Sequence, residues 1–170
     1  MIGRSETMIK WALYGAATLA ALLFQGFVLQ FLLLWGVMPF LYPALTALVG
    51  MYEGPVAGSA YALVLGVACD LALGGPIPCF YTLIFPAAGL CAGLMAESWL
   101  PAGVLCALAA SAAAFVLTDA FHLLILALTG QRAFGTAALV ALKETGVTLP
   151  FVLPVFLLFR AVSRKCHFYD

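Results

Sequence analysis

Apolar residues run along the chain in long stretches, and short breaks rich in proline, glycine or charge separate them. A helix needs about 20 apolar residues to cross the hydrocarbon core of a bilayer, so each long stretch predicts a membrane-spanning helix. The predicted helices cover residues 11–35, 39–52, 54–73, 80–97, 102–128 and 137–159. This pattern predicts an all-α integral membrane protein, a compact bundle of about six transmembrane helices forming one domain over residues 1–170.

The segment over 39–52 is the shortest of these and contains Pro43. At a rise of about 1.5 Å per residue, such a segment barely reaches across the hydrocarbon core. It is interpreted either as a short tilted helix or as a half-crossing packed inside the bundle, where non-helical backbone is tolerated.

The composition strengthens the membrane prediction. Apolar residues make up 66% of the chain and charged residues 8%, and the mean hydropathy is +1.17. A soluble domain carries roughly 25% charged residues. The formal net charge is zero, which argues against nucleic acid as a partner, because binding it needs a basic face. The apolar run over 11–37 is too long for a cleaved signal, so a retained first helix is predicted.

Positive charges lie near both ends of the chain, at Arg4 and Lys10 and again at Arg160, Arg164 and Lys165. Cytoplasmic segments of membrane proteins carry an excess of Lys and Arg. Both termini are therefore predicted to be cytoplasmic, which six crossings would satisfy.

Small residues recur at every fourth position between Gly50 and Gly74. Residues four apart advance by about 40° around a helix, so about three consecutive members of this row face one neighbour. Gly58, Ala62 and Gly66 are predicted to form a groove into which another helix backbone presses.

Asp70 continues this row, and Gly75 and Pro76 follow it in an uncharged turn. Ionisable residues at membrane depth are costly and suggest a role. Asp70 is therefore expected either to have a structural or recognition role beside the groove, or to lie in water where the helix reaches the interface. The three residues together are candidates for partner contact or for an architectural corner.

Three further polar residues are candidates for the interior of the bundle. Gln25 lies within the first predicted helix, where an amide needs a partner helix to bond to. Asp119 and His122 lie three apart on one helical face, and Lys143 and Glu144 lie on the next helix. An interhelical polar clasp is the favoured interpretation, and a proton relay through these groups is the alternative.

The chain contains no phosphate-binding loop, no nucleophile elbow and no zinc-protease motif. Its five cysteines show no C-x-x-C spacing. The sequence thus predicts no catalytic residue, no metal ligand set and no cofactor.

The stretch from Pro43 to Gly93 resembles the core of the rod-shape-determining membrane protein family MreD. The pattern Gly58-x7-Gly66-x3-Asp70-Leu71-x3-Gly75 carries the resemblance, and Cys79 stands where that family usually has glycine. The resemblance implies a non-enzymatic, multi-pass scaffold of the cell-elongation machinery in the bacterial cytoplasmic membrane. It also implies partners: a bitopic MreC-like protein, an MreB-like cytoskeleton, a SEDS glycosyltransferase and a penicillin-binding transpeptidase, besides membrane lipid.

A second interpretation comes from the substrate-binding S components of energy-coupling-factor vitamin transporters, which the chain also resembles. Those proteins have six helices, are thought to share the MreD fold, and present an A-x-x-x-A face on their first helix to a membrane coupling subunit. Ala12, Ala16 and Ala20 fit such a face. A third hypothesis, a proton-coupled small transporter, would depend on Asp119.

Overall fold

A computed structural model describes residues 4–31, 35–73, 77–129 and 134–167, and these form six α-helices and one short 3-10 helix. Five of the helices (α1, α3, α4, α5 and α6) are long and apolar enough to cross a membrane. All regular secondary structure in the described residues is therefore helical, and the helices are those of a multi-pass membrane protein. The elements are α1 Arg4–Phe27, η1 Leu29–Phe31, α2 Tyr42–Glu53, α3 Pro55–Leu73, α4 Phe80–Ser98, α5 Val104–Leu128 and α6 Phe134–His167.

The segment predicted over 39–52 differs from a full crossing. Helix α2 has 12 residues, which at about 1.5 Å per residue gives about 18 Å, well short of the roughly 30 Å hydrocarbon core. Pro43 lies in its first turn, and residues 38–41 before it are not helical. Every residue from Pro43 to Met51 is buried. The described residues thus contain the six helices expected, five of membrane length and one short helix enclosed by them, which favours the half-crossing over the full one.

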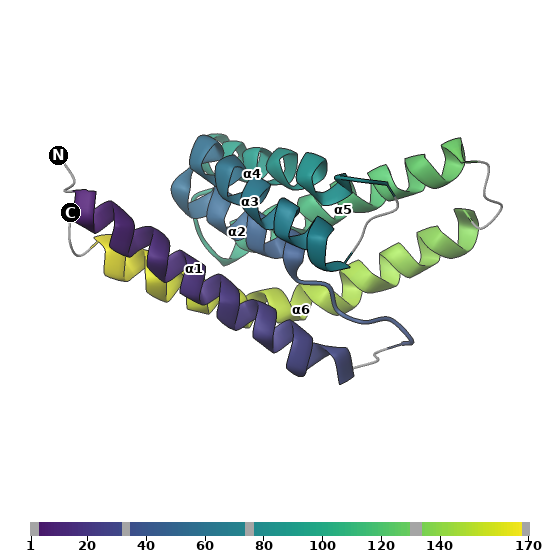
Figure 1. The fold of residues 1–170 in the computed structure, drawn as a ribbon, viewed down its shortest axis with the longest axis horizontal. Helices are drawn as coiled ribbons and strands as arrows, with labels where there is room; N and C mark the ends of the chain where they lie inside the picture. Colours follow the sequence, from purple (N-terminus) through teal and green to yellow (C-terminus); the bar gives the residue numbers. More distant parts are fainter. Residues whose placement is uncertain (1–3, 32–34, 74–76, 130–133, 168–170) are drawn as a thin grey trace.

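The helix ends also differ from the expected ones. Helix α1 ends at Phe27 and a 3-10 turn follows it, whereas the apolar run alone suggested an end near residue 35. Helix α6 continues to His167, past the expected end at 159, and it bends near its middle (Figure 1), in the region that holds Pro150 and Pro154. Helix α4 runs through Pro86 without a break.

The helices form two groups (Figure 1). Helices α2, α3 and α4 pack closely together, and α5 lies against α2 and α4. Helix α1 lies along the C-terminal half of α6. The N-terminal half of α6 and the C-terminal half of α5 extend beyond the other helices. The start of α1 and the end of α6 lie at the same end of the molecule.

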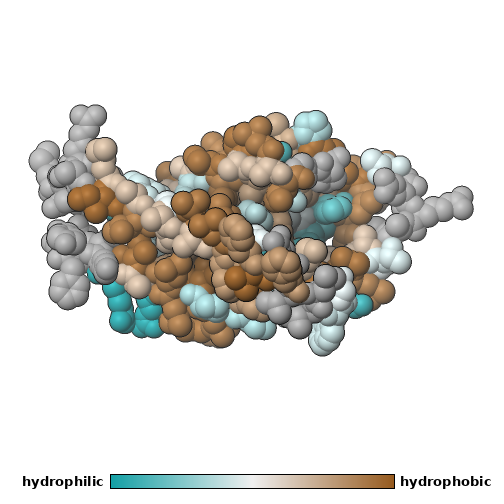
Figure 2. All heavy atoms as spheres, turned by 60° about the horizontal axis from the view of Figure 1, so that its bottom comes forward, coloured by the Kyte–Doolittle hydropathy of each residue, from teal (hydrophilic) through white to brown (hydrophobic). Residues whose placement is uncertain are grey.

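A continuous core joins the two groups. Its largest buried side chains include Tyr14 of α1, Leu45 and Leu48 of α2, Phe85 of α4 and Phe156 of α6. Apolar side chains also cover the outside, as in Leu71, which is 84% exposed. An apolar exterior around an apolar core is what a hydrocarbon solvent requires. Figure 2 shows this predominantly hydrophobic surface.

Candidate functional site

Three glycines form the closest contact between α2, α3 and α4. A Cβ atom added to Gly50 of α2 would overlap the carbonyl oxygen of Gly89 in α4. One added to Gly58 of α3 would overlap Gly50, and one added to Gly89 would lie 2.8 Å from the carbonyl oxygen of Gly58. Only residues without a side chain allow three backbones to approach this closely. Gly58, predicted to line a groove, lies at this three-helix contact.

The rest of the predicted groove receives α4. Ala62 is fully buried, and its Cβ lies 3.2 Å from the position a Cβ would take at Gly89. A Cβ on Gly66 would lie 2.6 Å from the carbonyl oxygen of Tyr81 and 2.9 Å from the Cα of Thr82. Gly58, Ala62 and Gly66 therefore face the backbone of α4 over about half of α3.

Asp70 binds the start of α4. One carboxylate oxygen accepts a hydrogen bond from the backbone N–H of Tyr81 (3.0 Å), and the other accepts bonds from the N–H of Thr82 (2.9 Å) and its hydroxyl (2.6 Å). These N–H groups belong to the first turn of α4, where no bond within the helix is possible. Cys79, which precedes α4, provides no side-chain cap. Asp70 thus acts as an N-cap supplied by a different helix.

Two other predicted corner residues, Gly75 and Pro76, lie outside the described residues. The described residues on either side of the turn show how the two helices are joined. Asp70 lies in the last turn of α3 and bonds to the first turn of α4, so the carboxylate joins the two helices across the turn. Asp70 is half-buried at this junction.

Gln25 holds the non-helical backbone that leads into α2. Its amide nitrogen donates to the carbonyl oxygen of Pro39 (2.9 Å), and its amide oxygen accepts from the N–H of Leu41 (2.7 Å). Between them, the N–H of Phe40 donates to the hydroxyl of Thr148 in α6 (3.1 Å). Non-helical backbone at membrane depth needs such partners, because hydrocarbon offers none. The side-chain amide of Gln25 in α1 therefore provides hydrogen-bond partners for the non-helical backbone before α2.

Two further polar links connect α1 to the group of α2 and α3. Lys10 forms an ion pair with Glu53 at the end of α2 (2.5 Å), and the hydroxyls of Thr18 and Tyr61 lie 2.5 Å apart. Lys10, Thr18 and Gln25 are spaced by seven or eight residues, so they share one face of α1. The opposite face contains the predicted small-residue row. Ala12, Ala16 and Ala20 are exposed there.

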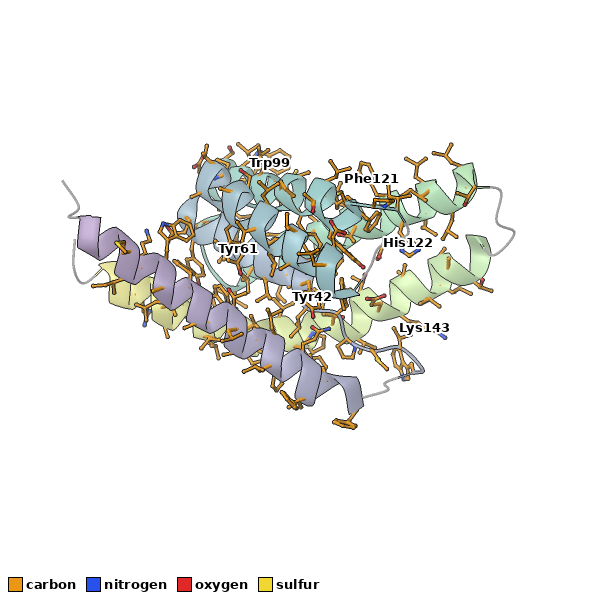
Figure 3. The ribbon with its side chains drawn as sticks, viewed as in Figure 1. Tyr42, Tyr61, Trp99, Phe121, His122 and Lys143 are labelled. Carbon is orange, nitrogen blue, oxygen red and sulfur yellow. The ribbon has the colours of Figure 1, made fainter. Side chains whose placement is uncertain are left out.

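His122 lies where α5 and α6 extend beyond the bundle (Figure 3), and Asp119 precedes it by three residues on α5. The hydroxyl of Thr145 in α6 donates to the Asp119 carboxylate (3.3 Å), so Asp119 does link the two helices. His122 is exposed and its ring meets that of Phe80 edge-on, with centroids 6.0 Å apart. Glu144 lies close enough to Asp119 for their charges to interact. Figure 2 shows hydrophilic atoms set back in a hollow toward this end of the molecule.

Sequence reasoning missed several residues that matter to this arrangement. Thr82 and Thr148 complete the polar contacts of Asp70 and of the segment before α2. Tyr61 provides the partner of Thr18. Single hydroxyls in apolar helices carry no spacing signature, so only the tertiary contacts reveal them.

The five membrane-length helices define the class as a multi-pass helical membrane protein. No family model, no curated protein and no solved structure matches the chain.

Proposed function

We propose that this protein is a non-enzymatic scaffold of the cell-elongation complex in the bacterial cytoplasmic membrane. One observation supports the proposal above others. Gly58, Gly66 and Asp70, which carry the MreD resemblance, all bind or contact α4 and together fix the corner between α3 and α4. A motif whose members hold helices together preserves a shape, as expected for a scaffold, and it leaves none of the three for chemistry.

The expected partners are those of the elongation complex: a bitopic MreC-like protein, an MreB-like cytoskeleton, and a SEDS glycosyltransferase with its transpeptidase. The exposed apolar faces of the long helices offer these partners a surface within the membrane. Such contacts would be made by packing and by few hydrogen bonds.

Deletion of the protein from its rod-shaped host tests this proposal. Round or swollen cells are expected, and a plasmid copy of the wild type should restore rods. A copy carrying Asp70→Ala should restore them poorly at equal membrane abundance, because the α3–α4 corner is loosened. Ser59→Ala is the matched control, since this serine of α3 donates its hydroxyl within its own helix, to the carbonyl oxygen of Val56. Normal rods after clean deletion would contradict the scaffold role.

The polar hollow favours a second candidate function, the vitamin-binding S component. Asp119, Glu144 and His122 could bind the polar part of a small molecule there, and the exposed alanine face of α1 would contact a coupling subunit. This candidate predicts that gently purified protein retains a small molecule detectable by mass spectrometry. Its absence, together with no binding across a panel of vitamins, would count against the S-component function.

A further inference from the structure

Two arginines lie one turn apart near the end of α6. Arg160 and Arg164 are both exposed, and residues four apart on a helix are neighbours on one face, with Cβ atoms about 5–6 Å apart. Figure 2 shows hydrophilic atoms gathered at the lower left of the molecule, the end at which α1 begins and α6 ends. This pair is a concentrated positive charge at the end of the apolar stretch of α6.

Among the side chains that the structure describes, no carboxylate forms an ion pair with Arg160 or Arg164. Within the described ranges, the one ion pair joins Lys10 to Glu53, so that carboxylate is already engaged. Glu97 of α4 directs its carboxylate toward Gly54, where one oxygen lies 3.2 Å from the position that a Cβ would take, and among the described residues it forms no ion pair with either arginine. Two neighbouring like charges repel, and an external anion between them would relieve the repulsion.

Aromatic contacts hold one of the two arginines in place. The guanidinium carbon of Arg160 lies 5.9 Å from the centre of the Phe156 ring, within the range of a cation–π contact. Phe156 is buried and stacks with Tyr52 of α2, the ring centroids being 6.2 Å apart. A guanidinium fixed in this way loses less freedom when it binds an anion.

Tyr52 adds a hydrogen-bond donor beside the pair. Both guanidinium groups lie close enough to affect its phenol electrostatically. Burial raises the pKa of Tyr52 to about 12, against the opposite effect of Arg160 and Arg164, so the phenol keeps its proton near neutral pH. A neutral O–H donor beside two guanidinium groups suits the oxygens of a phosphate.

The position of the pair identifies the source of that phosphate. The apolar stretch of α6 runs from Gly135 to Arg164, so the two arginines lie where the membrane-spanning part ends. Trp11 lies near the start of the adjacent α1 and is partly exposed, as tryptophans often are at headgroup level. We propose that Arg160, Arg164 and Tyr52 form a binding site for the phosphate headgroup of an anionic phospholipid. The site goes beyond the scaffold role and does not depend on it.

Lipid retention by the full-length purified protein tests this site. Native mass spectrometry would compare bound phosphatidylglycerol with bound phosphatidylcholine for the wild type and for the Arg160→Gln/Arg164→Gln variant. Each basic side chain near an anionic surface is worth about five-fold in affinity, so the double variant should lose about 30-fold of its phosphatidylglycerol binding. Lys143→Gln is the matched control, because it removes an exposed cation of the same helix at its other half.

Three results decide the matter. Equal phosphatidylglycerol binding by the double variant, or equal binding of the two lipids by the wild type, would overturn the site. Displacement of the lipid by millimolar inorganic phosphate would show a site for free phosphate and would overturn the lipid assignment. Should the double variant not fold, judged by its helical circular dichroism, Tyr52→Phe replaces it, with an expected loss of about three-fold from one hydrogen bond and no loss as the contradicting result.

Discussion

Replacement of Asp70 by alanine should destabilise the protein through one identifiable loss. The substitution removes three hydrogen bonds to the start of α4 and leaves the N–H groups of Tyr81 and Thr82 without a partner. Hydrogen bonds between membrane helices average about 0.6 kcal/mol each, which gives about 2 kcal/mol for three. Loss of an ordinary N-cap costs about 0.5–2 kcal/mol, and bonds to a charged group are stronger. A total loss of about 2–4 kcal/mol is therefore expected.

Asp70→Asn refines this prediction. An amide has one oxygen to accept hydrogen bonds, and its NH2 group would face a backbone N–H, so about half of the alanine effect should appear. The assay is reversible unfolding by SDS of protein refolded in mixed micelles, followed by circular dichroism. Ser59→Ala, on the same helix but with its hydroxyl bonded within that helix, is the control. A free energy of unfolding for Asp70→Ala within about 0.5 kcal/mol of that control would refute the capping role.

The same unfolding assay tests three further predictions. Gly66→Ala should lower the free energy of unfolding by about 2–3 kcal/mol, because its Cβ would lie 2.6 Å from a carbonyl oxygen of α4. Gly15→Ala, whose Cβ would meet no atom within 4 Å, should raise it by about 0.5–1 kcal/mol. Equal effects of the two substitutions would contradict the packing account. Gln25→Leu should lower the free energy of unfolding by about 2–4 kcal/mol, roughly twice the effect of Thr148→Val. Gln25 makes two hydrogen bonds to the segment before α2, whereas Thr148 makes one. A larger effect of Thr148→Val would contradict the role of Gln25. Cys79→Gly should stabilise by about 0.5–2 kcal/mol, because Cys79 has a left-handed backbone with φ of 60°, and a loss of stability would contradict that reason.

The sequence predicts those parts of the fold that depend on long apolar stretches. Apolar stretches of membrane length predict five of the helices, because hydrocarbon imposes that length on any spanning helix. The short helix α2 follows no such rule. Its length depends on enclosure by other helices and on Gln25 and Thr148, which are far apart in sequence. Local pattern contains no information on such partners.

In the candidate site, too, local spacing predicts part of the arrangement and leaves the partners undetermined. The spacing of Gly58, Ala62 and Gly66 predicts a close helix contact, but it does not say that α4 fills the groove or that α2 joins it. Asp70 leaves a choice between water and a helix contact, and the structure places it at the start of α4. The outward orientation of Ala12 and its neighbours on α1 could not be foreseen either, because a small-residue face packs equally well against this chain or another.

Quantitative affinity purification from native membranes tests the scaffold role most directly. The protein, tagged and expressed at its natural level, would be cross-linked in its rod-shaped host, solubilised and analysed by mass spectrometry beside an untagged strain. The scaffold proposal predicts enrichment of an MreC-like bitopic protein together with a glycosyltransferase and transpeptidase of the elongation complex, reduced by Asp70→Ala and not by Ser59→Ala. Co-elution of an ATP-binding cassette with its membrane coupling subunit, without any elongation protein, would contradict it.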